Sequence, residues 1–191
     1  MTARTHDVIA FASLISIATM YPPQQVNIPT VGAVLVGNII GSLLPDLDQA
    51  GNRLWDITPL GNATGRFFRR VFISHRSISH SLLGLFIFYK LLQIILPIIF
   101  NPIYIDYHLV LIAIMIGYIS HLLADLFTKE GLPLLFPYKH KFGIPPVKTL
   151  RITTSSIVEN FIILPLSVGY LFWFIASNQT LVINLIRKIH S

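Results

Sequence analysis

A long apolar run from Leu109 to Phe127 constrains the fold of this chain more than any other feature. Its length is close to the roughly 20 residues that a helix needs to cross a bilayer, and it carries His121 and Asp125 near its end. Residues four apart share one face of a helix, so this imidazole and this carboxylate are neighbours. Ionisable groups in so apolar a segment are costly and usually serve a site. The alternative is a structural His–Asp hydrogen bond that holds two helices together, and the spacing alone does not distinguish the two roles.

The composition indicates a membrane protein. Charged residues make up 12% of the 191 residues, about half of the roughly 25% usual in soluble domains, and we treat residues 1–191 as one domain. The chain has no cysteine, so any metal would be held by histidine and carboxylate, which suits zinc and also manganese or iron. The net charge of +6 comes from basic loops without a nucleic-acid motif. Membrane lipids are therefore the predicted partner, and nucleic acid is not.

Five apolar segments predict an all-α, polytopic membrane protein with about five membrane-embedded helices. One starts near residue 6, and the others cover 27–44, the stretch after residue 80, 109–127 and 157–176. The first resembles a signal peptide in outline, but no small-x-small cleavage site follows it. We expect an uncleaved first helix, which is short for a full span.

Two local features refine this picture. Gly32, Gly37 and Gly41 in the second segment are expected to allow close helix packing. Ser77 or Ser79 is expected to cap the third segment.

The basic residues predict the orientation. Eleven of the 14 Lys and Arg residues fall at Arg4, in the loop 49–76 and in the connector 129–151. The turns at 21–27 and 101–108 carry none. The positive-inside rule then places the face that carries these basic residues, and with it the N-terminus, in the cytoplasm.

On this topology the ionisable residues at the segment ends gather at the cytoplasmic face. They are His6, Asp46, Asp48, His75, His80, His121, Asp125 and Glu159. Asp106 and His108 fall on the opposite face, and His140 and His190 lie in a basic loop and the tail, so these four are excluded. Histidines and carboxylates from several helices fit a mononuclear or dinuclear hydrolytic site that uses a metal-activated water. The chain has no Gly-x-Ser-x-Gly motif and no P-loop that would suggest another mechanism.

Four motifs carry a family resemblance. TARTH, GSLLPDLD, HRSISHSLLG and GYISHLLADLFTKEGLPLLFP, in this order and spacing, resemble the YdjM-type family of inner-membrane-associated, LexA-regulated proteins that are assigned as metal-dependent hydrolases. The resemblance covers roughly residues 2–160. It implies a bacterial inner-membrane hydrolase.

The order His, Asp, His and then His-x-x-x-Asp is also similar to the all-helical zinc-dependent phospholipase C and nuclease superfamily. This similarity implies two ions held by His6, Asp48 or Asp46, His80 or His75, His121 and Asp125, with Asp125 bridging them. The chain departs from that pattern at Ser155, where a histidine would be needed before Glu159. The resemblance thus leaves Glu159 either to support the ligands or to act as a general base.

Three functions are therefore considered. The leading expectation is a hydrolase with two divalent ions, preferably zinc, which cleaves a phosphoester of a lipid or amphiphile at the cytoplasmic face of the inner membrane. A non-enzymatic metal transporter or sensor is the alternative, although a transporter should carry polar groups through the middle of the membrane. A structural membrane protein with His–Asp clamps is the third.

Overall fold

The computed structural model describes residues 1–47, 78–138 and 140–190, and these residues are helical apart from turns, loops and two isolated β-bridges. The helices are α1 (Ala3–Met20), α2 (Ile28–Leu43), α5 (Leu82–Ile99), α6 (Tyr107–Leu126), α7 (Leu164–Ser177) and α8 (Gln179–His190). A 3₁₀ turn, Leu44–Asp46, follows α2, and a π-helical turn, Glu159–Ile163, leads into α7. The predicted all-α class is confirmed.

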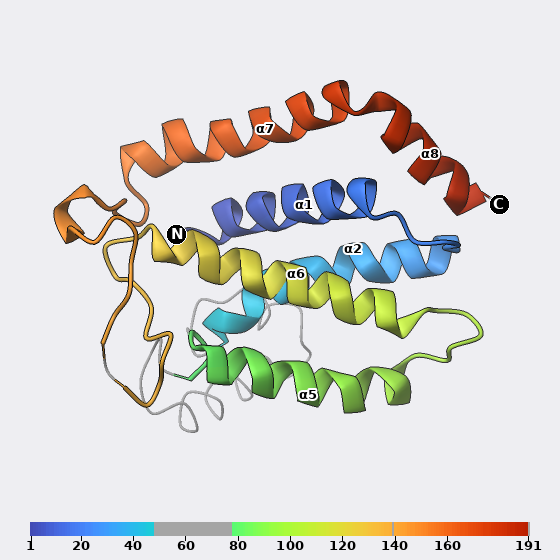
Figure 1. The fold of residues 1–191 in the computed structure, drawn as a ribbon, viewed down its shortest axis with the longest axis horizontal. Helices are drawn as coiled ribbons and strands as arrows, with labels where there is room; N and C mark the ends of the chain where they lie inside the picture. The colour runs from blue at the N-terminus through green and yellow to red at the C-terminus, as the bar shows by residue number, and fades with distance from the viewer. Residues whose placement is uncertain (48–77, 139, 191) are drawn as a thin grey trace.

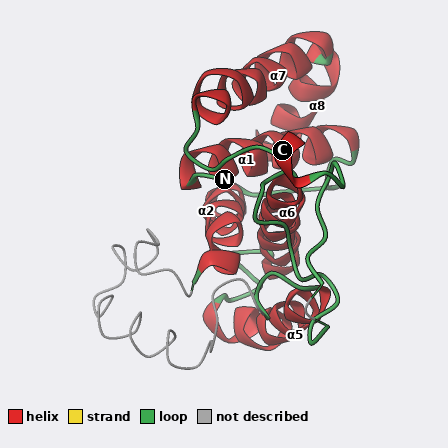
Figure 2. Cartoon of the chain, turned by 90° about the vertical axis from the view of Figure 1, so that its left-hand side faces the viewer, coloured by secondary structure: helices red, strands yellow, loops and turns green. Residues whose placement is uncertain are grey.

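The long helices lie side by side in layers (Figure 1). Figure 2 shows α1, α2 and α6 at the centre, with α5 on one side and α7 on the other. Helix α6 packs most extensively on α2 and also contacts α1 and α5, whereas α7 packs chiefly on α1. The central helix of the bundle is therefore the one that carries His121 and Asp125.

Four helical stretches are long and apolar enough to cross a membrane. They are Ile28–Asp46, Leu82–Ile99, Tyr107–Leu126 and Glu159–Ser177. This finding supports a polytopic helical membrane protein. Helix α1 is not among the four, in keeping with the expectation that the first segment is short for a full span.

Glycines bring α2 and α6 into close contact. A Cβ on Gly41 would lie 2.1 Å from a backbone carbonyl oxygen of α6, and a Cβ on Gly117 would lie 2.2 Å from one of α2. Gly37 also faces α6. The prediction is wrong for Gly32, where a Cβ would meet nothing within 4 Å, because Gly32 lies on the exposed face of α2. The close approach at Gly117 lies one turn before His121 and sets that imidazole against the end of α2.

The cap of α5 differs from the prediction. Ser81 caps the helix by accepting a hydrogen bond from the amide of Gly84 at 3.1 Å. Ser77 lies outside the described residues. Ser79 lies in the turn before the cap, where its carbonyl accepts a hydrogen bond from the hydroxyl of Tyr118 on α6. That bond ties the turn that carries the next residue, His80, to the central helix.

The excluded residues lie elsewhere, as predicted. Asp106 caps the start of α6, with its carboxylate accepting from the amides of His108 and Leu109 at 2.9 and 3.3 Å. His140 packs against Phe142 in the connector after α6. The side chain of His190 lies outside the described residues.

Candidate metal centre

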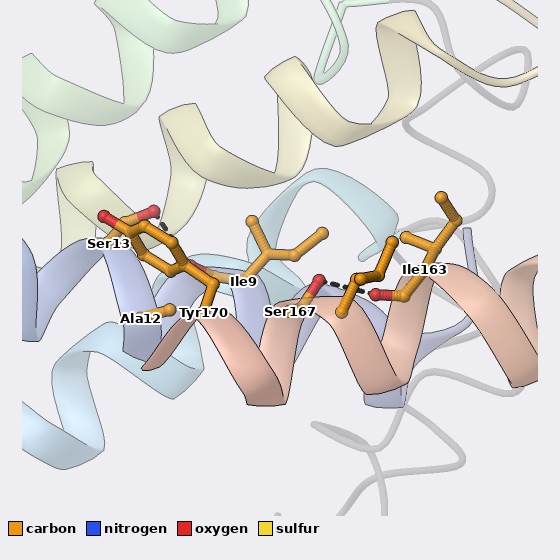
Figure 3. Close-up of a pocket in the computed structure, with 7 residues that line it drawn as sticks. Ile9, Ala12, Ser13, Ile163, Ser167 and Tyr170 are labelled. Carbon is orange, nitrogen blue, oxygen red and sulfur yellow. Dashed lines mark hydrogen bonds between the residues drawn. The ribbon is translucent and has the colours of Figure 1, made fainter. Parts of the chain in front are cut away.

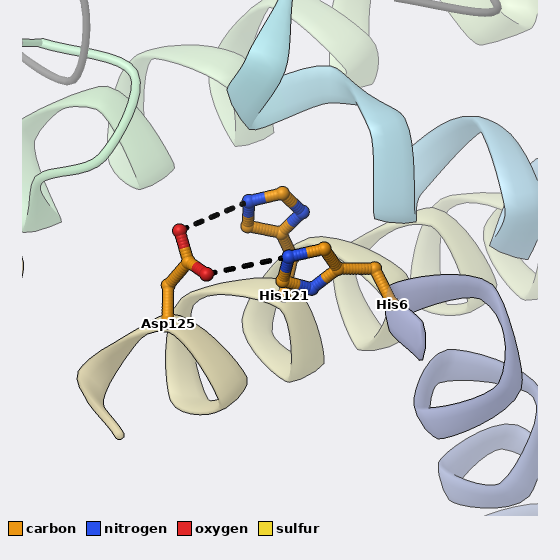
Figure 4. Close-up of side chains that lie close together, drawn as sticks. All are labelled: His6, His121 and Asp125. Carbon is orange, nitrogen blue, oxygen red and sulfur yellow. Dashed lines mark ion pairs between the residues drawn. The ribbon is translucent and has the colours of Figure 1, made fainter. Parts of the chain in front are cut away.

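Five of the predicted site residues meet at one end of the bundle. They are His6 from α1, Asp46 from the turn after α2, His80 from the turn before α5, and His121 and Asp125 from the last two turns of α6. The four other than Asp46 are at most 1% exposed. Asp48 and His75 lie outside the described residues. Figure 4 shows how His6 and His121 project towards Asp125 from two different helices.

The donor atoms converge at similar separations. Nε2 of His6 lies 3.3 Å from Oδ1 of Asp125, and Nε2 of His80 lies 3.4 Å from Oδ1 of Asp46. Nε2 of His121 lies 3.8 Å from an oxygen of each of these two aspartates, and Nε2 of His80 lies 3.8 Å from Oδ2 of Asp125. The rings of His6 and His121 stack with centroids 3.7 Å apart. Imidazole and carboxylate thus surround a common centre.

These separations fit a metal site better than a set of hydrogen bonds. Good N–H···O hydrogen bonds span about 2.7–3.2 Å. Ligand atoms about 2.0–2.1 Å from a tetrahedral zinc ion lie about 3.3 Å from one another. Both ring nitrogens of His6 and Nε2 of His121 are buried and make no hydrogen bond within the described residues. The His121–Asp125 distance of 3.8 Å is also too long for the hydrogen bond that a helix clamp requires.

The donors form two overlapping sets, each with atoms within 4.8 Å of one another. One set is His6, His121 and Asp125, and the other is Asp46, His80 and His121. One imidazole nitrogen can ligate one ion, so His121 can serve one set at a time through Nε2. Asp125 presents its two oxygens to different partners, with Oδ1 facing His6 and Oδ2 facing His80 and His121.

A main-chain group fixes the tautomer of His121. Its Nδ1 lies 2.6 Å from the carbonyl oxygen of Ser42 at the end of α2. A carbonyl only accepts, so Nδ1 carries the proton and Nε2 keeps its lone pair, as in most metal-binding histidines. The hydroxyl of Ser42 donates to the carboxylate of Asp7 on α1 at 2.8 Å. These contacts join α1, α2 and α6 behind the His–Asp cluster.

Glu159 supports the start of α1. Its carboxylate accepts from the amide of Thr2 at 2.5 Å, from the hydroxyl of Thr5 at 2.8 Å and from the amide of Ser155 at 2.7 Å. It belongs to neither donor set among the described residues. These bonds hold the first turn of α1, which presents His6. The general-base role, one of the two roles that the resemblance left open for Glu159, stays a prediction.

Several supporting groups were missed by sequence reasoning. They are Ser42, Thr2, Thr5, Asp7 and the amino group of Met1, which lies 2.5 Å from Oδ1 of Asp125. The sequence could have indicated Asp7, because it is a second ionisable residue beside His6 in an apolar helix. No sequence pattern indicates the hydroxyl and main-chain groups, because their contacts depend on their position in the fold.

Comparison with known proteins agrees with this architecture. The family model described as YdjM inner membrane protein matches residues 1–190. The chain is 28% identical to the uncharacterized protein YvsG of Bacillus subtilis (strain 168) over 91% of its own length and 94% of that protein. It is 34% identical to the inner membrane proteins YdjM of Escherichia coli (strain K12) and Shigella flexneri, over 56% of its length and 50% of theirs. No solved structure shows significant similarity.

Proposed function

This chain belongs to the YdjM family of inner membrane proteins, and from that membership and the geometry of its buried cluster we propose that it is a membrane-embedded, metal-dependent hydrolase. Its substrate is a phosphoester of a lipid or amphiphile, cleaved by a metal-activated water at the cytoplasmic face. The similarity to the phospholipase C and nuclease superfamily is part of this proposal.

One observation carries the proposal, namely that three imidazoles and two carboxylates from four segments converge, in two sets whose donor atoms lie within 4.8 Å of one another. Burying such groups is costly unless they are paired or bind a metal. We assign His6, Asp46, His80, His121 and Asp125 as ligands. Because its two oxygens face different histidines, Asp125 is the residue suited to bridge two ions.

The donor set suits zinc, with manganese or iron as alternatives. When bound, such an ion supplies a Lewis acid that activates water and stabilises charge on a phosphoryl oxygen. The chain's own residues orient the ligands. The Ser42 carbonyl aims Nε2 of His121, and Glu159 holds the turn that presents His6. The basic connector that follows α6, at the end of the bundle that carries the cluster, would attract the phosphate group.

The test is a metal-dependent activity assay on the full chain in lipid nanodiscs. Zinc-loaded protein is screened against phospholipids and soluble phosphoesters, with His80→Ala as the site variant and His108→Ala as the control at the other end of the bundle. We expect the wild type and His108→Ala to hydrolyse a substrate, and we expect His80→Ala to be inactive. EDTA should abolish the activity and zinc should restore it. If zinc-loaded protein hydrolyses none of these substrates, the hydrolase proposal is overturned and a metal sensor or transporter is favoured.

A further inference from the structure

A cavity of about 320 Å³ lies between α1 and α7 (Figure 3). Its walls include Ile9 and Ser13 from α1 and Ile163, Leu166 and Ser167 from the π-helical turn and α7. Ile9 lies one turn along α1 from His6. The cavity, here called the α1–α7 slot, therefore begins beside the metal centre and runs away from it along the helices.

Two polar contacts join α1 to the α7 side on either side of the slot. At the end near the metal centre, the hydroxyl of Thr5 donates to Glu159 at 2.8 Å. At the other end, the hydroxyls of Ser16 and Tyr170 lie 3.1 Å apart. The residues that line the slot run from Ile9 to Ser13 on α1 and from Ile163 to Tyr170 on the α7 side, which is roughly 10 Å on the longer side at 1.5 Å per residue. That length is about a third of the hydrocarbon core, which is roughly 30 Å thick, so the slot can hold part of an acyl chain.

The residues that line the slot favour an apolar ligand. The hydroxyls of Ser13 and Ser167 donate to the carbonyls of Ile9 and Ile163 in their own helices, each at 2.8 Å. Helix hydroxyls bonded in this way leave no donor for a ligand. Only 6% of the apolar window within Glu159–Ser177 is buried inside the protein. Because this stretch is long and apolar enough to cross a membrane, we expect the slot to face hydrocarbon. Water would find few partners there.

We propose that the α1–α7 slot binds one acyl chain of a lipid from the leaflet next to the metal centre. The headgroup end of that lipid then lies beside His6, and the chain end lies near Tyr170. The further step, that this lipid is the substrate, rests on the proposed function and excludes a purely soluble phosphoester.

The test uses photolabelling. Zinc-loaded full-length protein in nanodiscs is labelled with phosphatidic acid that carries a diazirine in its acyl chain, and the labelled residues are mapped by mass spectrometry. We expect slot residues to be labelled more strongly than Phe172, which is 69% exposed on α7. Equal labelling of the slot and of Phe172 would mean ordinary surrounding lipid and would overturn the proposal.

A matched pair of variants tests the same point. Ser167→Leu fills the slot, and Ser177→Leu makes the same change at an exposed position at the end of α7. Excluding about two methylene groups should lower slot labelling about tenfold in Ser167→Leu and leave it unchanged in Ser177→Leu. Equal labelling in both variants would count against the slot. If Ser167→Leu fails to fold, competition on the wild type decides, because dioleoyl lipid should displace the probe and dihexanoyl lipid should not.

The outcomes separate the two proposals. Slot labelling without hydrolysis of any phosphoester would support the acyl-chain site and contradict the hydrolase proposal. Metal-dependent hydrolysis of dihexanoyl and dioleoyl lipids at equal rates, without slot labelling, would keep the hydrolase and remove the acyl site.

Discussion

Replacing Asp125 with asparagine separates a metal ligand from a helix clamp. Asp125 is fully buried, with Oδ1 3.3 Å from His6 and 2.5 Å from the amino group of Met1, and with Oδ2 3.8 Å from His121. Asparagine keeps the volume and one oxygen but removes the charge. If Asp125 bridges two ions, we expect metal content to collapse in Asp125→Asn.

The magnitude follows from linkage. A metal present at about 100 times its dissociation constant stabilises the folded protein by about 2.7 kcal/mol, and this increment should vanish in the variant. A clamp hydrogen bond in a membrane protein would contribute only about 0.6 kcal/mol, and independently of zinc. The variant also leaves the amino group of Met1 without its buried carboxylate. The informative quantity is therefore the difference in thermal stability between zinc and EDTA, measured together with metal content.

Asp106→Asn is the matched control. Asp106 caps α6 at the other end of the bundle, and asparagine caps a helix about as well. The control should keep the wild-type metal content and the full effect of zinc on stability. Wild-type zinc stoichiometry in Asp125→Asn would refute the assignment of that residue as a ligand.

Three further predictions concern packing, support and orientation. Gly41→Ala should destabilise the protein by about 1–3 kcal/mol or more through overpacking, whereas Gly32→Ala in the same helix should not, and equal thermal shifts would contradict the α2–α6 contact. Glu159→Gln should leave one of three donors unsatisfied and cost about 1–3 kcal/mol; unchanged thermal stability, with activity lost, would favour the general base instead. In intact cells, Lys141→Cys should be shielded from impermeant thiol reagents and Asn101→Cys should label, and the reverse pattern would overturn the cytoplasmic orientation.

The clustered histidines and aspartates were predictable because each is an ionisable residue at the end of an apolar segment. The four-residue spacing of His121 and Asp125 fixed their common face, and the segment order brought His6 and His80 to the same end of the bundle. Asp46 lies in the cluster, with Oδ1 3.4 Å from Nε2 of His80. Asp48 lies outside the described residues, so the choice between the two aspartates stays open. The single-domain assignment stays a prediction.

The supporting contacts were not predictable in the same way. The carbonyl of Ser42 bonds His121 only because Gly117 lets α2 and α6 approach, and no side-chain pattern records a main-chain acceptor. The cap of α5 falls at Ser81 because the preceding turn is tied to Tyr118. Tertiary contacts therefore decided the details that local pattern left open.

The most direct test of the metal centre is zinc X-ray absorption spectroscopy on the purified, zinc-reconstituted chain. The chain has no cysteine, so the account predicts a shell of nitrogen and oxygen at about 2.0–2.1 Å without sulfur, and outer-shell scattering from more than one imidazole. Folded protein that stays metal-free after reconstitution, or zinc with the spectrum of the hydrated ion, would contradict it.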